Sequence, residues 1–300
     1  MIKRTLYFGS QVYLSTSLDQ LIIDKPNTDK ISVPIEDIGM IIFDHQQLSI
    51  TQATLQRLLN NNASILWCDE SHLPQGIVYP FQINQTFSEK LKYQLEASVP
   101  LKKQLWRQTI ISKITNQSKI LSEQNIPVMN MEYWAKSVCS GDSENHEARA
   151  AAYYWRNIFD ENEGFTRGRY GSPPNHALNY GYAILRAIIC RSLVASGCMP
   201  VLGIHHHNKY NAFCLADDIM EPYRPFVDRI VIELWKKYKI EFPKELSKEI
   251  KSELLKIPVI DVKIEDKTGP LMVQVQRSTS SLMDCFEGKS RKILYPEMQL

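Results

Sequence analysis

The sequence has no cysteine pattern that could build a disulfide framework or a structural zinc site. Its six cysteines stand at positions 68, 139, 190, 198, 214 and 285, and no two of them form a C-x-x-C pair. A chain of 300 residues with 44% hydrophobic content can bury a large core without covalent crosslinks. We therefore expect the cysteines to be reduced, mostly buried and without a functional role.

Long apolar runs are also missing. No stretch approaches the roughly 20 apolar residues of a membrane span, and even the apolar segment "AILRAIIC" (183–190) contains Arg186. The first residues, "MIKRTLYFGSQVYL", carry two basic side chains, but polar positions interrupt the apolar run that a signal peptide needs. We expect a soluble, cytoplasmic protein with no membrane partner.

The chain has no overall excess of charge, since its formal net charge is +2 and its pI is near 8.1. Charge is instead segregated along the sequence. No carboxylate lies between Glu163 and Asp217, an interval that contains Arg167, Arg169, Arg186, Arg191 and Lys209, and residues 90–119 are rich in lysine. Acidic side chains gather at 142–163 and 217–221. This pattern suits a protein that holds a divalent cation beside a bound polyanion, and uneven surface charge without a function is the alternative.

Residues 1–80 are predicted to form an amino-terminal β domain that resembles a small sandwich. Short β-branched or aromatic runs, separated by turn residues, indicate strands at 4–9, 11–16, 20–24, 31–34, 39–44 and 64–69. The leucine spacing in "TQATLQRLLNNN" (51–62) predicts one helix. We expect "QGIVYPFQINQ" (75–85) to be a linker.

Residues 81–300 are predicted to form a larger, all-α domain, which makes the fold class α+β with two domains. Apolar residues take helical spacing from about Phe87 to residue 120, with Pro100 as the expected break. Further helices are expected at about 144–160, 176–197, 221–239, 244–255 and 270–292.

Glu147 is the first candidate for chemistry. It begins the alanine-rich segment "HEARAAAYYWRNIF", in which Ala150, Ala151 and Tyr154 are expected to continue its helix face. A carboxylate that points inward from such a face needs an ion partner. A solvated cap at the start of the helix is the alternative.

The segment "VLGIHHHNKYNAFCLADDIMEPYRP" (201–225) supplies the other candidates. Asp218 and Glu221 are three residues apart, so we expect them on one face near the amino end of a helix, as ligands or as simple caps. In an extended loop, His205 and His207 would point one way and His206 the other. Carboxylates with one imidazole suit Mg²⁺ or Mn²⁺, which favours phosphodiester cleavage or transfer.

Several blocks resemble a known family in order and spacing. They are "HEARAAAYYW", "PPNHALNYGYAIL", "LGIHHHN" and "FCLADDIMEPYRPFVD". Together they are similar to the signature blocks of the CRISPR-associated integrase of the spacer-acquisition module, the Cas-one family. The start "RTLYFG" and the chain length look like the form that accompanies Cas9-type (type II) systems. The resemblance covers nearly the whole chain.

The resemblance implies a set of site residues. Glu147 and Glu221 match the metal-binding acids, and the register from Gly203 selects His206, with His205 as the fallback. Asp218 matches an acid that is either a ligand or an orienting group. Supporting positions are Arg224 of the Arg-Pro pair, Tyr154, and Asn179 in the central helix block. No organic cofactor is implied, only Mg²⁺ or Mn²⁺.

The implied activity is that of a DNA endonuclease and integrase, which inserts short foreign DNA fragments into a CRISPR repeat array. A 3′-hydroxyl of the fragment attacks a phosphodiester of the repeat. The implied partners are double-stranded DNA, a second copy of the chain bound through the β domain, and a dimer of a small Cas-two protein in a heterohexamer. A Cas9-type nuclease and an accessory DNA-end-binding protein complete the set.

Two other functions fit the residues alone. One is a general metal-dependent nuclease that acts on branched DNA without a small partner. The other is a non-catalytic scaffold whose basic helices hold DNA, in which the acidic residues are structural.

Overall fold

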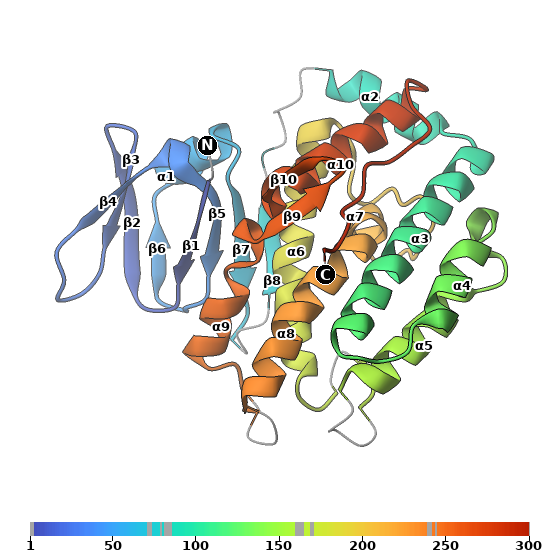
Figure 1. Cartoon of the computed structure of the whole chain (residues 1–300). Helices are drawn as coiled ribbons and strands as arrows, with labels where there is room; N and C mark the ends of the chain where they lie inside the picture. The colour runs from blue at the N-terminus through green and yellow to red at the C-terminus, as the bar shows by residue number, and fades with distance from the viewer. Residues whose placement is uncertain are drawn as a thin grey trace.

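The computed structural model describes residues 3–70, 74–78, 80, 86–159, 165–168, 171–238, 242–243 and 245–299. A β-rich amino-terminal region is followed by a larger helical region (Figure 1). The mixed α+β fold expected from the sequence is therefore confirmed. No helix in the described part of the chain is long and apolar enough to cross a membrane.

The β region contains two four-stranded sheets. In order across the first sheet, the strands are β1 (Arg4–Phe8), β5 (Ile38–Phe43), β7 (Ser64–Cys68) and β8 (Pro74–Val78). Across the second sheet they are β4 (Ile31–Pro34), β3 (Gln20–Asp24), β2 (Val12–Ser17) and β6 (Leu48–Ile50). The helix α1 (Gln52–Asn60) follows β6 and leads into β7, and the hydroxyl of Thr51 caps its start.

The strand β5 explains how the two regions join. All six of its residues are buried, because successive side chains point to opposite faces of the sheet and both faces are covered. Ile41 and Phe43 belong to the core between the two sheets, whereas Met40 and Ile42 belong to the core of the helical region. The first sheet is therefore shared by both cores.

The helical region begins with two helices, and the break between them lies close to Pro100, as the sequence predicts. The helix α2 (Phe87–Glu96) ends just before α3 (Val99–Glu123), and Pro100 lies in the first turn of α3, where its missing N–H costs nothing. The remaining helices are α4 (Met129–Ser137), α5 (His146–Ile158), α6 (Asn175–Ser196), α7 (Cys214–Met220), α8 (Arg224–Tyr238), α9 (Lys248–Leu254) and α10 (Leu271–Phe286).

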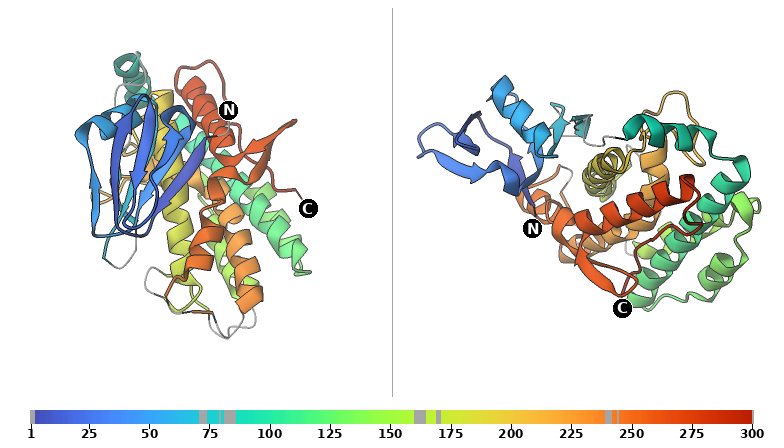
Figure 2. Two further views of the ribbon diagram at one scale, coloured as in Figure 1. Left: turned by 90° about the vertical axis from the view of Figure 1, so that its left-hand side faces the viewer. Right: turned by 90° about the horizontal axis from the view of Figure 1, so that it is seen from above.

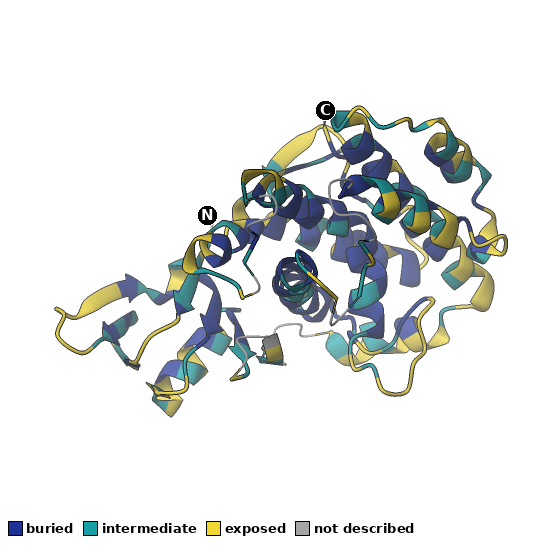
Figure 3. Cartoon of the chain, turned by 90° about the horizontal axis from the view of Figure 1, so that it is seen from below, coloured by how far each residue is buried: buried dark blue, intermediate teal, exposed yellow. Residues whose placement is uncertain are grey.

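The helix α6 runs through the centre of this region. It contacts α7, α8, α9 and α10, and also lies against β7 and β8 of the sheet. The end-on view in Figure 2 places α6 inside a ring of other elements, and Figure 3 shows that its residues are mostly buried. A helix that is apolar on most of its surface needs this kind of central position.

Three details differ from the sequence predictions. Residues 75–78 of the predicted linker belong to β8, and residues 79 and 81–85 lie outside the described part of the chain. The carboxy-terminal region is not all-α, because β9 (Asp261–Ile264) and β10 (Lys267–Pro270) form an antiparallel hairpin. The strand β6 and the helices α4 and α7 were not predicted either. All these elements are short, so their residue patterns carry little periodic signal.

A buried ion pair ties the two regions together. Lys251 of α9 lies 2.7 Å from Asp44 Oδ2 at the end of β5, and both side chains are almost fully buried. The hydroxyl of Tyr7 donates to the same oxygen at 2.5 Å. Burial, together with this hydrogen bond, raises the pKa of Tyr7 well above its ordinary value.

Candidate metal and phosphodiester site

Glu147 is placed by the way α5 begins. The carboxylate of Asp142 accepts hydrogen bonds from the backbone N–H groups of His146 at 3.0 Å and Glu147 at 2.9 Å, which satisfies two unpaired donors of the first turn. Glu147 therefore lies in that first turn with its side chain partly exposed. Ala150 and Tyr154 are fully buried, so the predicted helix face is confirmed.

Glu221 occupies a tighter turn than the sequence predicted. It is the first residue of the 3₁₀ turn η3 (Glu221–Tyr223), which lies between α7 and α8, and its side chain is buried. Asp218 lies within α7, so the two acids are not near the amino end of one helix. The prediction was wrong because a proline such as Pro222 is typical of the first turn of a helix. In the structure, the short helix α7 has already ended just before Glu221 and Pro222.

Lys113 connects the two glutamates. Its ammonium nitrogen lies 2.6 Å from Glu147 Oε1 and 2.6 Å from Glu221 Oε2. Arg224 Nη2 reaches the other oxygen of Glu221, Oε1, at 3.1 Å. The carboxylates of two segments far apart in the sequence therefore share one buried cation.

The charges in this cluster stabilise one another. Burial alone would lower the pKa of Lys113, but the Glu221 and Glu147 carboxylates outweigh it and the pKa is raised. Burial would likewise raise the pKa of Glu221, but Arg224 and Lys113 outweigh it and the pKa is lowered. Both groups are held in their charged forms.

The donor set fits a hard cation. Glu221 Oε2 is buried and accepts no directed hydrogen bond, although the Lys113 ammonium lies 2.6 Å away. An oxygen held this way keeps a lone pair for a cation. Within the described residues, however, no group of three or more His, Cys, Asp or Glu side chains is already arranged to hold a metal ion.

Asp218 organises the histidine loop. Its carboxylate accepts hydrogen bonds from the backbone N–H groups of Ile204 at 2.7 Å, His205 at 2.9 Å and His206 at 3.3 Å. In an extended segment, successive N–H groups would diverge, so the expectation of an extended loop was wrong. Gly203 is required here, because a Cβ would collide with the His206 carbonyl oxygen.

The three histidines have different environments. His206 Nδ1 lies 2.5 Å from Asp218 Oδ1, and this hydrogen bond raises the pKa of His206. The ring of His205 stacks on that of Trp106, with centroids 4.1 Å apart, and burial lowers the pKa of His205. His207 lines a neighbouring cavity.

The supporting residues divide into two groups. Arg224 contacts Glu221, as described, and its guanidinium also lies over the Tyr182 ring, 5.0 Å from the centroid. Tyr154 donates to buried Asp228 at 3.1 Å, and Asn179 accepts from Arg167 at 2.7 Å. Tyr154 and Asn179 therefore hold the framework around the cluster.

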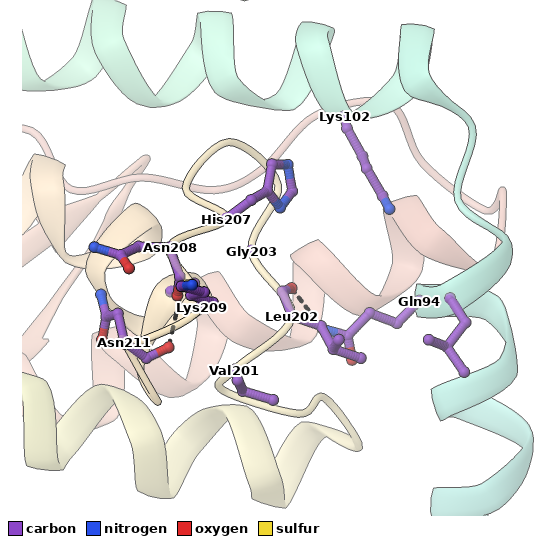
Figure 4. A pocket seen from close by; sticks show the side chains of 11 residues that line it. Gln94, Lys102, Val201, Leu202, Gly203, His207, Asn208, Lys209 and Asn211 are labelled. Atoms are coloured by element: carbon purple, nitrogen blue, oxygen red, sulfur yellow. Dashed lines mark hydrogen bonds between the residues drawn. The ribbon is translucent and has the colours of Figure 1, made fainter.

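Two basic cavities flank this region. One, of about 490 Å³, is lined by Arg167, Asn179, Tyr182, Arg186 and Arg224, among other residues. The other, of about 310 Å³, lies between the histidine loop and α3, where Lys102 and His207 point into the opening from opposite sides (Figure 4). Gln94 of α2 fixes the loop there by donating to Leu202 O at 3.0 Å. Phosphate groups suit such cationic surroundings.

Part of the predicted charge pattern cannot be placed. Residues 160–163 of the acidic segment and Arg169 lie outside the described residues. The sequence prediction also gave Lys113 no separate role and did not identify Asp142. A signal for Lys113 existed, because it falls three residues after buried Ile110, on the apolar face of a helix.

Comparison with known proteins identifies the family of the chain. Residues 6–257 match the family model described as CRISPR associated protein Cas1. The chain is 36% identical, over 98% of its length and 95% of the relative's, to the CRISPR-associated endonuclease Cas1 of Neisseria meningitidis serogroup C (strain 8013).

Solved structures show the same fold. A casposase bound to its integration product superposes with a TM-score of 0.78 at 18% identity, covering 98% of this chain and 92% of that one. A chain of a partial Cas6-RT-Cas1–Cas2 complex gives a TM-score of 0.65 at 20% identity, with 100% of both chains covered. Because the family model spans most of the sequence and the Neisseria relative spans nearly all of it, the chain belongs to the Cas1 family of CRISPR-associated proteins.

Proposed function

We propose that the chain is a metal-dependent DNA endonuclease and integrase that inserts short DNA fragments into a CRISPR repeat array. One observation carries the proposal: Glu147 and Glu221, from different parts of the chain, hold one cation between them, with Lys113 as that cation here. Two carboxylates that converge on a cation are the core of an oxygen-rich Mg²⁺ or Mn²⁺ site.

The residues that would hold the metal are Glu147, Glu221 and His206. Because His206 Nδ1 is bonded to Asp218, Nε2 is the ring nitrogen left for coordination. The bound ion would supply stabilisation of the charge that develops on the phosphate oxygens and the leaving oxygen. Arg224 keeps the Glu221 carboxylate charged and oriented.

The reaction is a transesterification. The 3′-hydroxyl oxygen of the fragment forms a new bond to the phosphorus of a repeat phosphodiester, and the bond to the 3′-oxygen of the repeat breaks. The attacking hydroxyl loses a proton and the leaving oxygen gains one, so no oxidant or energy source is needed. The arginines and lysines of the two basic cavities would hold the phosphates of both DNA segments.

The proposed assembly follows from family membership. Two homodimers of this chain, joined through their β regions, would bind a Cas2 dimer in a heterohexamer on double-stranded DNA. The Cas1–Cas2 assembly named in one structural neighbour and the DNA product named in another support these partners. A Cas9-type nuclease and an accessory DNA-end-binding protein would select or deliver the fragments.

Half-site integration tests the proposal. Fluorescent fragment DNA, repeat DNA and Mn²⁺ are incubated with the purified chain, with and without its Cas2 partner. We expect joined product only when Cas2 is present. The rate of product formation should fall at least 100-fold in Glu221→Gln, but not in the exposed control Asp266→Asn. Cleavage of branched DNA that needs no Cas2, without any joined product, would indicate a general nuclease instead.

A further inference from the structure

Lys113 occupies the space that the proposed function assigns to the metal. Its ammonium contacts both glutamates at 2.6 Å, and its side chain is only 9% exposed. A lysine in this position is not a surface partner that leaves the site freely, because its side chain is buried and its neighbours along α3, Ile110 and Ile114, are also fully buried.

The four side chains joined by these ion pairs balance one another in charge without a metal ion. Glu147 and Glu221 contribute two negative charges, and Lys113 and Arg224 contribute two positive charges. Protein sites that bind a divalent cation through oxygen ligands normally carry more negative than positive charge. A divalent ion that enters this balanced cluster repels the ammonium and leaves a buried positive excess.

Of the Lys113 ammonium and the two carboxylates that hold it, Glu147 is the group that opens most to solvent. The Glu147 side chain is 26% exposed, compared with 5% for Glu221 and 9% for Lys113. An ammonium pushed from between the carboxylates therefore moves toward this opening, where it needs a new anion. A DNA phosphate bound at the reaction centre supplies that charge.

We propose that Lys113 is a built-in competitor of the divalent metal, so that the site loads metal strongly only when a DNA phosphate is present. The inference rests on the proposed function, because it assumes that Glu147 and Glu221 bind the metal. It assigns Lys113 a regulatory role: the ammonium holds the carboxylates in place without DNA and limits metal-dependent cleavage until the substrate arrives.

Calorimetric titration of the full-length protein with Mn²⁺, in the absence of DNA, tests the competition. Lys113→Met keeps the length of the side chain and removes its charge. We expect this variant to bind Mn²⁺ at least tenfold more tightly than the wild type. The matched control Lys119→Met removes a charge six residues along the same helix and should change the affinity less than twofold. Equal or weaker binding by Lys113→Met would overturn the inference.

A second titration compares the wild type with Glu221→Gln and does not depend on the folding of Lys113→Met. A DNA duplex with 3′-dideoxy ends presents phosphates but cannot be joined. The Mn²⁺ binding of Glu221→Gln with the same duplex is measured first and subtracted. After this subtraction, adding the duplex should raise the Mn²⁺ affinity of the wild-type site at least tenfold. An affinity unchanged by the duplex contradicts the inference.

The same variants separate this inference from the proposed function. If the Mn²⁺ site survives Glu221→Gln, the proposed metal site is wrong. If Glu221→Gln removes the site but Lys113→Met binds Mn²⁺ no better than the wild type, only the role of Lys113 is wrong.

Discussion

The carboxylate of Asp218 lies 2.5 Å from His206 Nδ1 and also accepts three successive backbone N–H groups of the loop that carries this histidine. The side chain of Asp218 is completely buried, whereas that of His206 is 45% exposed. Asp218 therefore fixes the position of the loop and the orientation of the imidazole at once.

Asp218→Asn should weaken catalysis more than folding. The amide keeps the size of the side chain but loses the charge that orders the loop and His206. We expect strand transfer to fall about 10- to 100-fold, the usual effect of removing a group that orients a metal ligand. Product formation, measured beside thermal unfolding, checks this. A loss of activity no larger than that of the exposed control Asp266→Asn would contradict it.

The three histidines should respond differently to alanine. His206→Ala removes the imidazole that the Asp218 carboxylate orients, so we expect at least a 100-fold loss of strand transfer. His205→Ala removes a ring that stacks on Trp106 and should cost less than tenfold. His207→Ala should have the smallest effect on the chemical step. Single-turnover rates decide the order, and a larger loss for His205→Ala than for His206→Ala would reverse the assignment.

Asp228 predicts a dependence of stability on pH. Burial raises the pKa of Asp228 to about 7, although the Tyr182 and Tyr154 hydroxyls donate to its carboxylate. In the unfolded chain its pKa is about 3.9. Between these values the folded state keeps the proton and the unfolded state loses it, so the free energy of unfolding falls as pH rises, by at most about 1.4 kcal/mol per pH unit.

Urea unfolding of the wild type and Asp228→Asn measures this effect. The variant cannot ionise at this position, so the wild type should lose stability relative to the variant from about pH 4 to pH 7, and the difference should then level off. A difference that stays constant over this range, or changes in the opposite direction, contradicts the raised pKa.

Asn116 should be needed for the docking of the carboxy-terminal tail. Its buried amide group donates to the carbonyl oxygens of Pro222 at 2.9 Å and Pro296 at 3.0 Å, and accepts from Met298 N at 3.0 Å. Asn116→Ala removes these three buried hydrogen bonds, so we expect a loss of about 2–3 kcal/mol in the free energy of unfolding.

Limited proteolysis and urea unfolding check the role of Asn116. Residues 290–299 should become sensitive to protease in Asn116→Ala. The neighbouring variant Thr115→Ala, which changes an exposed residue of the same helix, should keep the tail protected. A tail that stays protected in both variants would show that other contacts hold it.

The sequence predicts the larger elements because their apolar spacing is long enough to reveal a period. The strand β5 and the helices α3 and α6 bury whole faces, so their positions follow from hydrophobic pattern alone. The strand β8 was not predicted because Pro74 and Gly76 are turn residues, and it is stable only because it pairs with β7 at the edge of the sheet.

The acidic residues of the site could be predicted from the sequence, but the residues that contact them could not. Glu147 and Glu221 stand out by residue type and spacing, and the structure brings both to Lys113. The place of Lys113 on the apolar face of α3 indicates that it is buried, but no local pattern indicates that it lies between two glutamates, one of them 34 residues further along the chain. The role of Asp218 also depends on a three-dimensional turn, in which three N–H groups converge on one carboxylate.

The most direct test of the metal site is a crystal structure of the protein with Mn²⁺ and DNA, measured at a wavelength where manganese scatters anomalously. We predict an anomalous peak about 2.1 Å from oxygens of Glu147 and Glu221 and from His206 Nε2, with the Lys113 ammonium moved away from between the glutamates. A map with no peak at these residues, and with Lys113 still bridging the two carboxylates in a DNA complex, would contradict the account.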